Sequence, residues 1–270
     1  MSMSSSVSGS HAASWIIAQL GAREHYVLAR QLHKCGRLHA LLTDAWVPPA
    51  SWHQALPDTL RSLFDRFHED LDDAPVFSST RKALAFEVEA RLRGWTGWTR
   101  MIRRNQWFER HLVHAIRAHS LLDPDPPPVV FAYSYAAHDL FVEAKKHGAI
   151  CVLGQIDAGP HEEDIVAAEH ERYPRYREQQ VRAPDAYWQH WKDECDLADA
   201  IVVNSVWSKK ALAEVGVAGD HIHVVPLAYT PPGLDIQPTY PTSFTDERPL
   251  RVLYLGTLTL RKGLARILDA

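Results

Sequence analysis

The sequence predicts an α/β protein in which a parallel sheet carries helices on both faces. Short apolar runs typical of buried strands alternate with amphipathic segments from residue 14 to residue 225, and glycine or proline ends several of them. Strands joined through helices in this way pair in parallel. With 270 residues, of which 46% are hydrophobic and 23% charged, the chain has ample material for such a core.

The N-terminal end predicts the first crossover unit of this sheet. A strand over Ser14–Leu20 ends at Gly21. A helix over Arg23–Cys35 and a strand over Leu38–Thr43 follow. The order GAREHY after the first strand does not match the GxGxxG pattern of dinucleotide sites, which disfavours a nucleotide-dependent oxidoreductase. Residues 44–79 show no clear period and are expected to be irregular with short helices.

Two amphipathic helices are predicted in the middle of the chain, over Arg81–Leu92 and Trp107–His119. In the first, Leu84, Val88 and Leu92 recur at helical spacing, so we expect them to form its apolar, packed face. The alternation of strands and helices then resumes after a proline cluster. The expected elements are Val129–Tyr133, Ala137–His147, Ala149–Leu153, a helix that starts at Pro160, Asp185–Ala198, Ala200–Val203, Val206–Val215 with Ser205 as N-cap, and His221–Val225.

The last twenty residues predict the opening unit of a second Rossmann-like domain. Arg251–Leu255 is an apolar run of strand type, and Gly256 permits a sharp turn after it. Lys262 then precedes a glycine and residues at helical spacing, which is how an anion-binding helix N-terminus begins. The sequence stops at Ala270 inside that helix, so we expect residues 250–270 to be a truncated start.

Two stretches resemble the retaining glycosyltransferases of family 4. Residues 200–229, AIVVNSVWSKKALAEVGVAGDHIHVVPLAY, are similar to the closing segment of that family's N-terminal domain, and LGTLTLRKG is similar to the start of its donor-binding domain. The resemblance implies two Rossmann-like domains that face each other across a cleft, the arrangement called GT-B. It divides the chain into a disordered tail (1–13), an acceptor-side domain (14–228), a proline-rich linker (229–249) and the truncated start of a nucleotide-sugar-binding domain (250–270).

The resemblance also implies residues that bind the donor diphosphate. Lys262 matches the family lysine that contacts it, and Gly256 matches the glycine of the turn. The arginine that follows this glycine in the family is Thr257 here, so Arg261 is expected to supply the charge. Gly21 corresponds to a glycine-containing loop near the donor phosphates. The alternative for Lys262 is an ordinary solvated lysine at a helix start.

Acceptor-binding and catalytic residues are expected where parallel strands end, because ligands gather there. After the first strand, Arg23, Glu24 and His25 either bind the acceptor or form a solvated first turn. The next two strands end in polar residues. Of these, Asp157 either accepts a proton from the acceptor hydroxyl or forms a turn before its helix. The predicted acceptor contacts on these strands are Tyr133, Ser134 and Gln155.

Several functional classes are disfavoured by composition and motif. A net charge of −4 gives no general attraction to nucleic acid, and no recognition motif accompanies the basic residues. The acidic residues and histidines of 161–171 lack HExxH spacing and suit a helix start, so no metal cofactor is expected. The three scattered cysteines indicate reduced thiols and a cytoplasmic location.

Residues 91–108 interleave arginines with tryptophans, which suits a membrane interface or a lipid-linked acceptor. The alternative is an ordinary helix pair with the tryptophans inward and the arginines outward. No run approaches the ~20 apolar residues of a membrane helix. Peripheral contact at the inner face of a membrane is therefore the form that such an association would take.

The predicted function is transfer of a sugar, with retention, from a nucleotide-sugar to a hydroxyl acceptor that is a glycan, a lipid-linked molecule or a small molecule. The chain would be mainly the acceptor-binding half and would be inactive alone. The alternative is a non-catalytic module that binds a glycan or a partner protein. Thr257 favours the module, whereas the intact Arg261–Gly263 sequence favours the enzyme.

Overall fold

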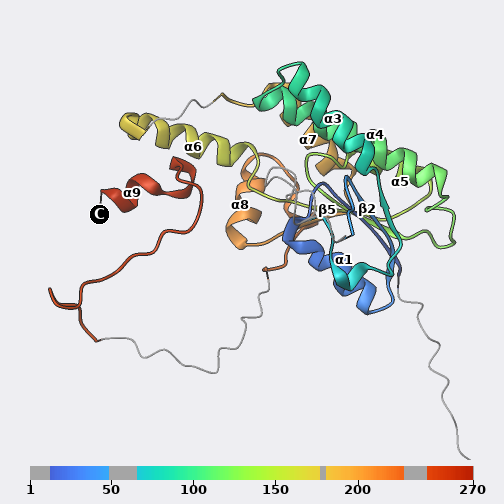
Figure 1. Ribbon diagram of the computed structural model, residues 1–270, viewed down its shortest axis with the longest axis horizontal. Coiled ribbons are helices and arrows are strands. Elements are labelled where there is room, and N and C mark those ends of the chain that lie inside the picture. The colour runs from blue at the N-terminus through green and yellow to red at the C-terminus, as the bar shows by residue number, and fades with distance from the viewer. Residues whose placement is uncertain (1–12, 49–65, 177–180, 228–241, 270) are drawn as a thin grey trace, which may run out of the picture.

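A computed structural model describes residues 13–48, 66–176, 181–227 and 242–269. It contains a seven-stranded sheet in which all neighbouring strands are parallel (Figure 1). The strand order is β3-β2-β1-β4-β5-β6-β7. The direction in which the chain adds strands therefore reverses between β1 and β4. The strands are β1 (Trp15–Gln19), β2 (Leu38–Thr43), β3 (Val76–Ser78), β4 (Val129–Tyr133), β5 (Cys151–Gly154), β6 (Ala200–Val203) and β7 (Ile222–Val224).

Helices cover both faces of the sheet, which confirms the predicted α/β Rossmann-like fold. On one face, α4, α5, α7 and α8 bury apolar side chains against strand residues such as Ile16 and Val130. On the other face, α1 and the turn before it pack Ala29 and Tyr26 against Ile17. Figure 1 shows α1 on one side of the strands and α4 with α5 on the other. The helices are α1 (Val27–Lys34), α3 (Thr80–Leu92), α4 (Gly97–Ala118), α5 (His138–Lys146), α6 (Pro160–Arg172), α7 (Asp185–Leu197), α8 (Val206–Glu214) and α9 (Leu264–Leu268).

The strands β2, β4 and β6 have the predicted bounds, whereas some other boundaries differ. The helix predicted from Arg23 begins only at Val27, because Glu24 and His25 have φ angles of 51° and 49°. Such angles lie outside the right-handed helical region. Helix α4 begins at Gly97, well before its predicted start. Strand β3 lies within the stretch that was expected to be irregular.

The predicted packed face of α3 is wrong. Leu84, Val88 and Leu92 are 38%, 58% and 83% exposed. The helix packs through its opposite face, because Phe86 contacts Trp107 with 5.8 Å between ring centroids. Helical spacing of apolar residues identified the helix correctly, but α3 has apolar residues on both sides and the spacing alone did not say which side is inward. The buried residues of α3 are Ala83, Phe86 and Ala90.

The strand predicted at Arg251–Leu255 does not form. Leu253 and Leu255 are 79% and 85% exposed, and no strand among the described residues pairs with this segment. A strand needs a neighbour to satisfy its backbone groups. The short helix α9 does form, and Figure 1 shows it beside α6, where Arg266 pairs with Glu169 at 2.6 Å.

The predicted domain boundaries stay predictions. Most of the tail over 1–13 and of the linker over 229–249 falls outside the described residues. Within the described ranges, none of the helices combines the length and the apolar character needed to cross a membrane.

Candidate functional site

A cavity of about 780 Å³ opens beside the carboxyl ends of the central strands. It lies on the same face of the sheet as α1, beside that helix and along β4, β5 and β6, so its floor is apolar and includes Phe131. Polar side chains from the strand ends line it as well, a mixture that is typical of small-molecule sites. Four of the predicted acceptor contacts lie here: Arg23, Glu24, Tyr133 and Gln155.

Gly154, in the floor of this cavity, has no room for a side chain. An added Cβ would lie 2.4 Å from the Cζ atom of Phe131, which is itself buried. We therefore expect Gly154→Ala to lower the free energy of unfolding by about 1–3 kcal/mol, because the ring must move within a packed core. Urea denaturation measures this. Gly219→Ala is the matched control, since nothing lies within 4 Å of that added Cβ; equal losses for both variants would contradict the prediction.

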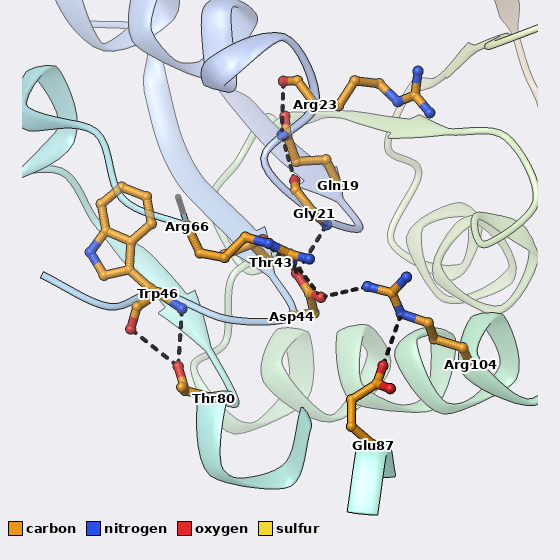
Figure 2. A network of polar contacts seen from close by, with 10 residues as sticks. All are labelled: Gln19, Gly21, Arg23, Thr43, Asp44, Trp46, Arg66, Thr80, Glu87 and Arg104. Carbon is orange, nitrogen blue, oxygen red and sulfur yellow. Dashed lines mark hydrogen bonds and ion pairs between the residues drawn. The ribbon is translucent and has the colours of Figure 1, made fainter. Parts of the chain in front are cut away.

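The loop after β1 is held by a buried acid that follows β2. Gly21 has a φ of 84°, which favours glycine, and its N–H donates to Oδ1 of Asp44 at 2.9 Å. At the end of β1, Nε2 of Gln19 donates to the carbonyl oxygens of Gly21 and Arg23, at 2.9 and 3.3 Å (Figure 2). These bonds fix the predicted diphosphate loop from both sides.

Asp44 is 4% exposed and faces two arginines (Figure 2). Nη1 of Arg66 donates to both of its carboxylate oxygens, at 2.6 and 2.7 Å, and Nη2 of Arg104 donates to Oδ2 at 3.1 Å. Burial alone raises the pKa of Asp44, but the charge and hydrogen bonds of Arg66, with the Gly21 N–H and Arg104, lower it below its ordinary value. Asp44 is therefore a charged anchor that ties the loop to two distant segments.

Sequence reasoning missed this anchor. The order LLTDAW places Asp44 directly after a strand, so the rule that selected other strand-end residues would have found it. The sequence around its two arginine partners gave no indication of these contacts. Arg66 lies in a stretch without period, and Arg104 is 60 residues away on α4.

The residues predicted as acceptor contacts after β1 and β4 differ in their surroundings. The guanidinium of Arg23 lies over the Tyr133 ring, 5.3 Å from its centroid. Burial, with a smaller contribution from the charge of Glu24, raises the pKa of Tyr133 to about 12, so its phenol is a neutral hydrogen-bonding group. His25 is exposed and does not line the cavity. The Oγ atom of Ser134 is buried and accepts the N–H of Ile156 at 3.3 Å, which joins the ends of β4 and β5.

Asp157 has the turn-forming role that was one of its two expected roles. Its Oδ1 atom accepts the N–H of Gly159 at 2.9 Å and the phenol O–H of Tyr135. Gln155 continues this network: Nε2 donates to the Tyr135 oxygen at 3.2 Å, and Oε1 accepts Nε1–H of Trp191 at 3.0 Å. Among the described residues, every hydrogen bond to the Asp157 carboxylate reaches Oδ1.

The predicted donor-side residues near the C-terminus lie elsewhere. Arg261 pairs with Glu162 at the start of α6, so its charge is already partly compensated. Lys262 is exposed and lines, with Arg261 and residues of α4 and α6, a second cavity of about 810 Å³. Gly256 is exposed, with nothing within 4 Å of an added Cβ. The two predicted diphosphate residues Gly21 and Lys262 therefore do not line the same cavity.

A further polar cluster escaped prediction because Glu109 lies 81 residues from His190 in the sequence. Ligand-type atoms of Glu109, His190 and Glu194 lie within 4.8 Å of one another. Both oxygens of Glu194 accept backbone N–H groups between β4 and α5, at 2.7 and 2.8 Å, and Nε2 of His190 lies 2.9 Å from Oε1 of Glu109. Burial raises the pKa of Glu194 to about 8. The cluster thus holds the loop after β4 through bonds that a metal ion would have to displace.

Comparison with known proteins adds similarity at the level of the fold. No protein-family model and no curated protein matched the chain. The chain is similar to UGT2 of Phytolacca americana complexed with UDP-2-fluoro-glucose and pterostilbene, at 15% identity and a TM-score of 0.44, over 83% of this chain and 55% of that one. It is also similar to a UDP-glucosyltransferase from Polygonum tinctorium capable of glucosylating indoxyl. Here the identity is 17% and the TM-score 0.37, over 86% of this chain and 56% of that one.

A third similar structure is a putative UDP-N-acetylglucosamine 2-epimerase from Listeria monocytogenes, at 12% identity and a TM-score of 0.38, over 79% of this chain and 45% of that one. The chain therefore spans about half the length of these proteins. At such identities the likeness concerns the arrangement of strands and helices, and it assigns no substrate.

Proposed function

We propose that the chain is the acceptor-binding half of a glycosyltransferase that moves a sugar, with retention, from a nucleotide-sugar to a hydroxyl acceptor. One observation carries the proposal. Arg23, Tyr133 and Gln155, from the ends of three different strands, line one cavity beside the point where the strand order reverses. Open α/β sheets bind their ligands at this point. The sequence resemblance to family 4 supplies the reaction class.

The cavity of about 780 Å³ is the proposed acceptor site, since ligand sites of roughly 300–1,000 Å³ hold drug-sized molecules. Its apolar floor suits the body of a glycan ring or a small aromatic acceptor. Arg23 and Glu24 can orient hydroxyl groups at its rim. Asp157 follows these lining residues and does not itself line the cavity. If the acceptor hydroxyl reaches it, the bonds to Oδ1 leave Oδ2 as the atom that would accept the proton.

Donor binding is proposed to require Lys262, whose ammonium is a suitable ligand for a diphosphate. We expect UDP or GDP, or one of their sugars, to stabilise the complete protein that contains these residues against heat. Lys262→Ala should weaken that nucleotide's affinity by about 10- to 100-fold, the loss expected for one charge-assisted hydrogen bond. A thermal-shift titration measures both.

The matched control is Lys210→Ala, which removes another exposed lysine on α8 and should leave the affinity unchanged. Loss of affinity in both variants would mean that general positive charge, and not Lys262, binds the nucleotide. No shift with any nucleotide would instead favour the non-catalytic module, the alternative that Thr257 supports.

A further inference from the structure

Helix α3 directs a line of large apolar side chains away from the protein. Leu84, Val88 and Leu92 lie one turn apart on the face opposite its buried residues, and the last of them is 83% exposed. A surface helix normally turns such a stripe toward the core. Figure 1 shows α3 and α4 together at one margin of the molecule, and the exposure of the three side chains places the stripe at the surface.

The surface around this stripe is basic, although the chain as a whole carries a net charge of −4. Residues 81–104 contain seven arginines and lysines but only two acids. Both acids are already paired within the helix pair, Glu89 with Arg93 at 2.9 Å and Glu87 with arginines of α4. Arg81 and Arg91 border the stripe, are exposed, and have no ion-pair partner among the described residues.

The tryptophans of this region take no part in the stripe. Trp95 lies between Phe86, at 6.0 Å, and the guanidinium of Arg103, at 4.3 Å from its ring centroid. Trp107 packs on Phe86 and on Phe108. The aromatic rings therefore hold α3 against α4, as in the helix-pair alternative, and any surface contact must be made by the leucines and valine of α3.

We propose that α3 docks the protein on an anionic membrane surface. Leu84, Val88 and Leu92 would enter the boundary between headgroups and acyl chains, while Arg81 and Arg91 meet the anionic headgroups. Charge decides between the candidate occupants: a second copy would bring the same basic surface and be repelled, whereas an anionic bilayer complements it. This inference is independent of the proposed sugar transfer, because it uses none of the residues assigned to that reaction.

Sedimentation with vesicles tests the proposal. The chain should bind vesicles of phosphatidylglycerol and phosphatidylcholine mixed at about 1:2, and bind pure phosphatidylcholine at least about tenfold more weakly. Val88→Ser combined with Leu92→Ser should weaken binding to the anionic vesicles by about tenfold or more, because two exposed apolar side chains are lost. Arg81→Gln combined with Arg91→Gln should weaken it as well and reduce its dependence on salt.

The control removes matched side chains elsewhere: Ile150→Ser with Val206→Ser, which are 54% and 61% exposed on other parts of the chain. Binding should persist in this variant. Three results would overturn the proposal: no binding to anionic vesicles, equal binding by the stripe variant, or a stripe variant whose only change is a dimer that becomes a monomer. The last result, seen by light scattering, would assign the stripe to a second copy.

Discussion

Replacing Asp44 with alanine is expected to lower the free energy of unfolding by about 3 kcal/mol. The buried carboxylate accepts five hydrogen bonds, from Gly21, Thr43, Arg66 and Arg104. Its removal takes this partner from the Arg66 guanidinium and a loop N–H, whereas Arg104 keeps Glu87 at 3.9 Å. A charge that loses its buried partner costs about 3–5 kcal/mol. We take the lower end of that range because the Arg104 side chain is 33% exposed and water can reach it.

Urea denaturation of Asp44→Ala beside Asp70→Ala measures this effect. Asp70 forms an ion pair of the same kind with Arg30 at 2.6 Å, but its side chain is 44% exposed. Its loss should cost much less than that of Asp44, because solvent screens surface pairs. Similar losses in the two variants would mean that burial does not strengthen the Asp44 contacts.

The contribution of Asp44 should also depend on pH, in a direction that the lowered pKa fixes. The folded-state pKa lies below the value of about 3.9 expected in the unfolded chain. The carboxylate therefore stabilises the fold fully above that unfolded value, and this stabilisation is lost as the pH falls through the folded pKa. The difference in stability between the natural chain and Asp44→Asn should be constant near neutral pH and shrink below about pH 4. A difference that grew on acidification would contradict this assignment.

Truncation of Trp191 to alanine is expected to cost about 3–5 kcal/mol, the range for a large aromatic side chain removed from a core. Trp191 is 2% exposed and donates Nε1–H to Gln155 at 3.0 Å. It also packs against the loop after β5, where an added Cβ on Gly159 would lie 3.2 Å from its ring. The variant thus loses core packing and releases a residue of the proposed acceptor site.

Thermal and urea denaturation measure the stability change, and Trp207→Ala provides the matched comparison. Trp207 is 53% exposed on α8, so its removal should change stability by about 0.5 kcal/mol or less. Trp191→Phe should lie between the two, because the phenyl ring keeps part of the packing but is smaller than the indole and lacks its N–H. If Trp191→Ala lowered the free energy of unfolding as little as Trp207→Ala does, the core around α7 would have to relax into the space left by the indole.

The sequence by itself determined the elements whose signals are local. Apolar runs of strand type located β2, β4 and β6. Ser205 caps α8 as predicted, accepting the N–H of Ser208 at 3.1 Å. The parallel pairing followed from the alternation of strands and helices, because such connections leave few other arrangements. Part of the site followed as well, since strand-end position alone brought Arg23, Tyr133 and Gln155 to one cavity.

The tertiary structure decided what depends on neighbours distant in the chain. The apolar residues of α3 mark a helix, but only the aromatic contacts of Phe86 decide that Leu84, Val88 and Leu92 point outward. The run at 251–255 has the composition of a strand, yet a strand also requires an edge with which to pair. The anchor of the Gly21 loop is likewise a contact between Asp44 and two arginines 22 and 60 residues away. A local sequence pattern indicates which secondary structure a segment can form. Which of its side chains are buried or paired depends on the segments that pack against it in the folded protein.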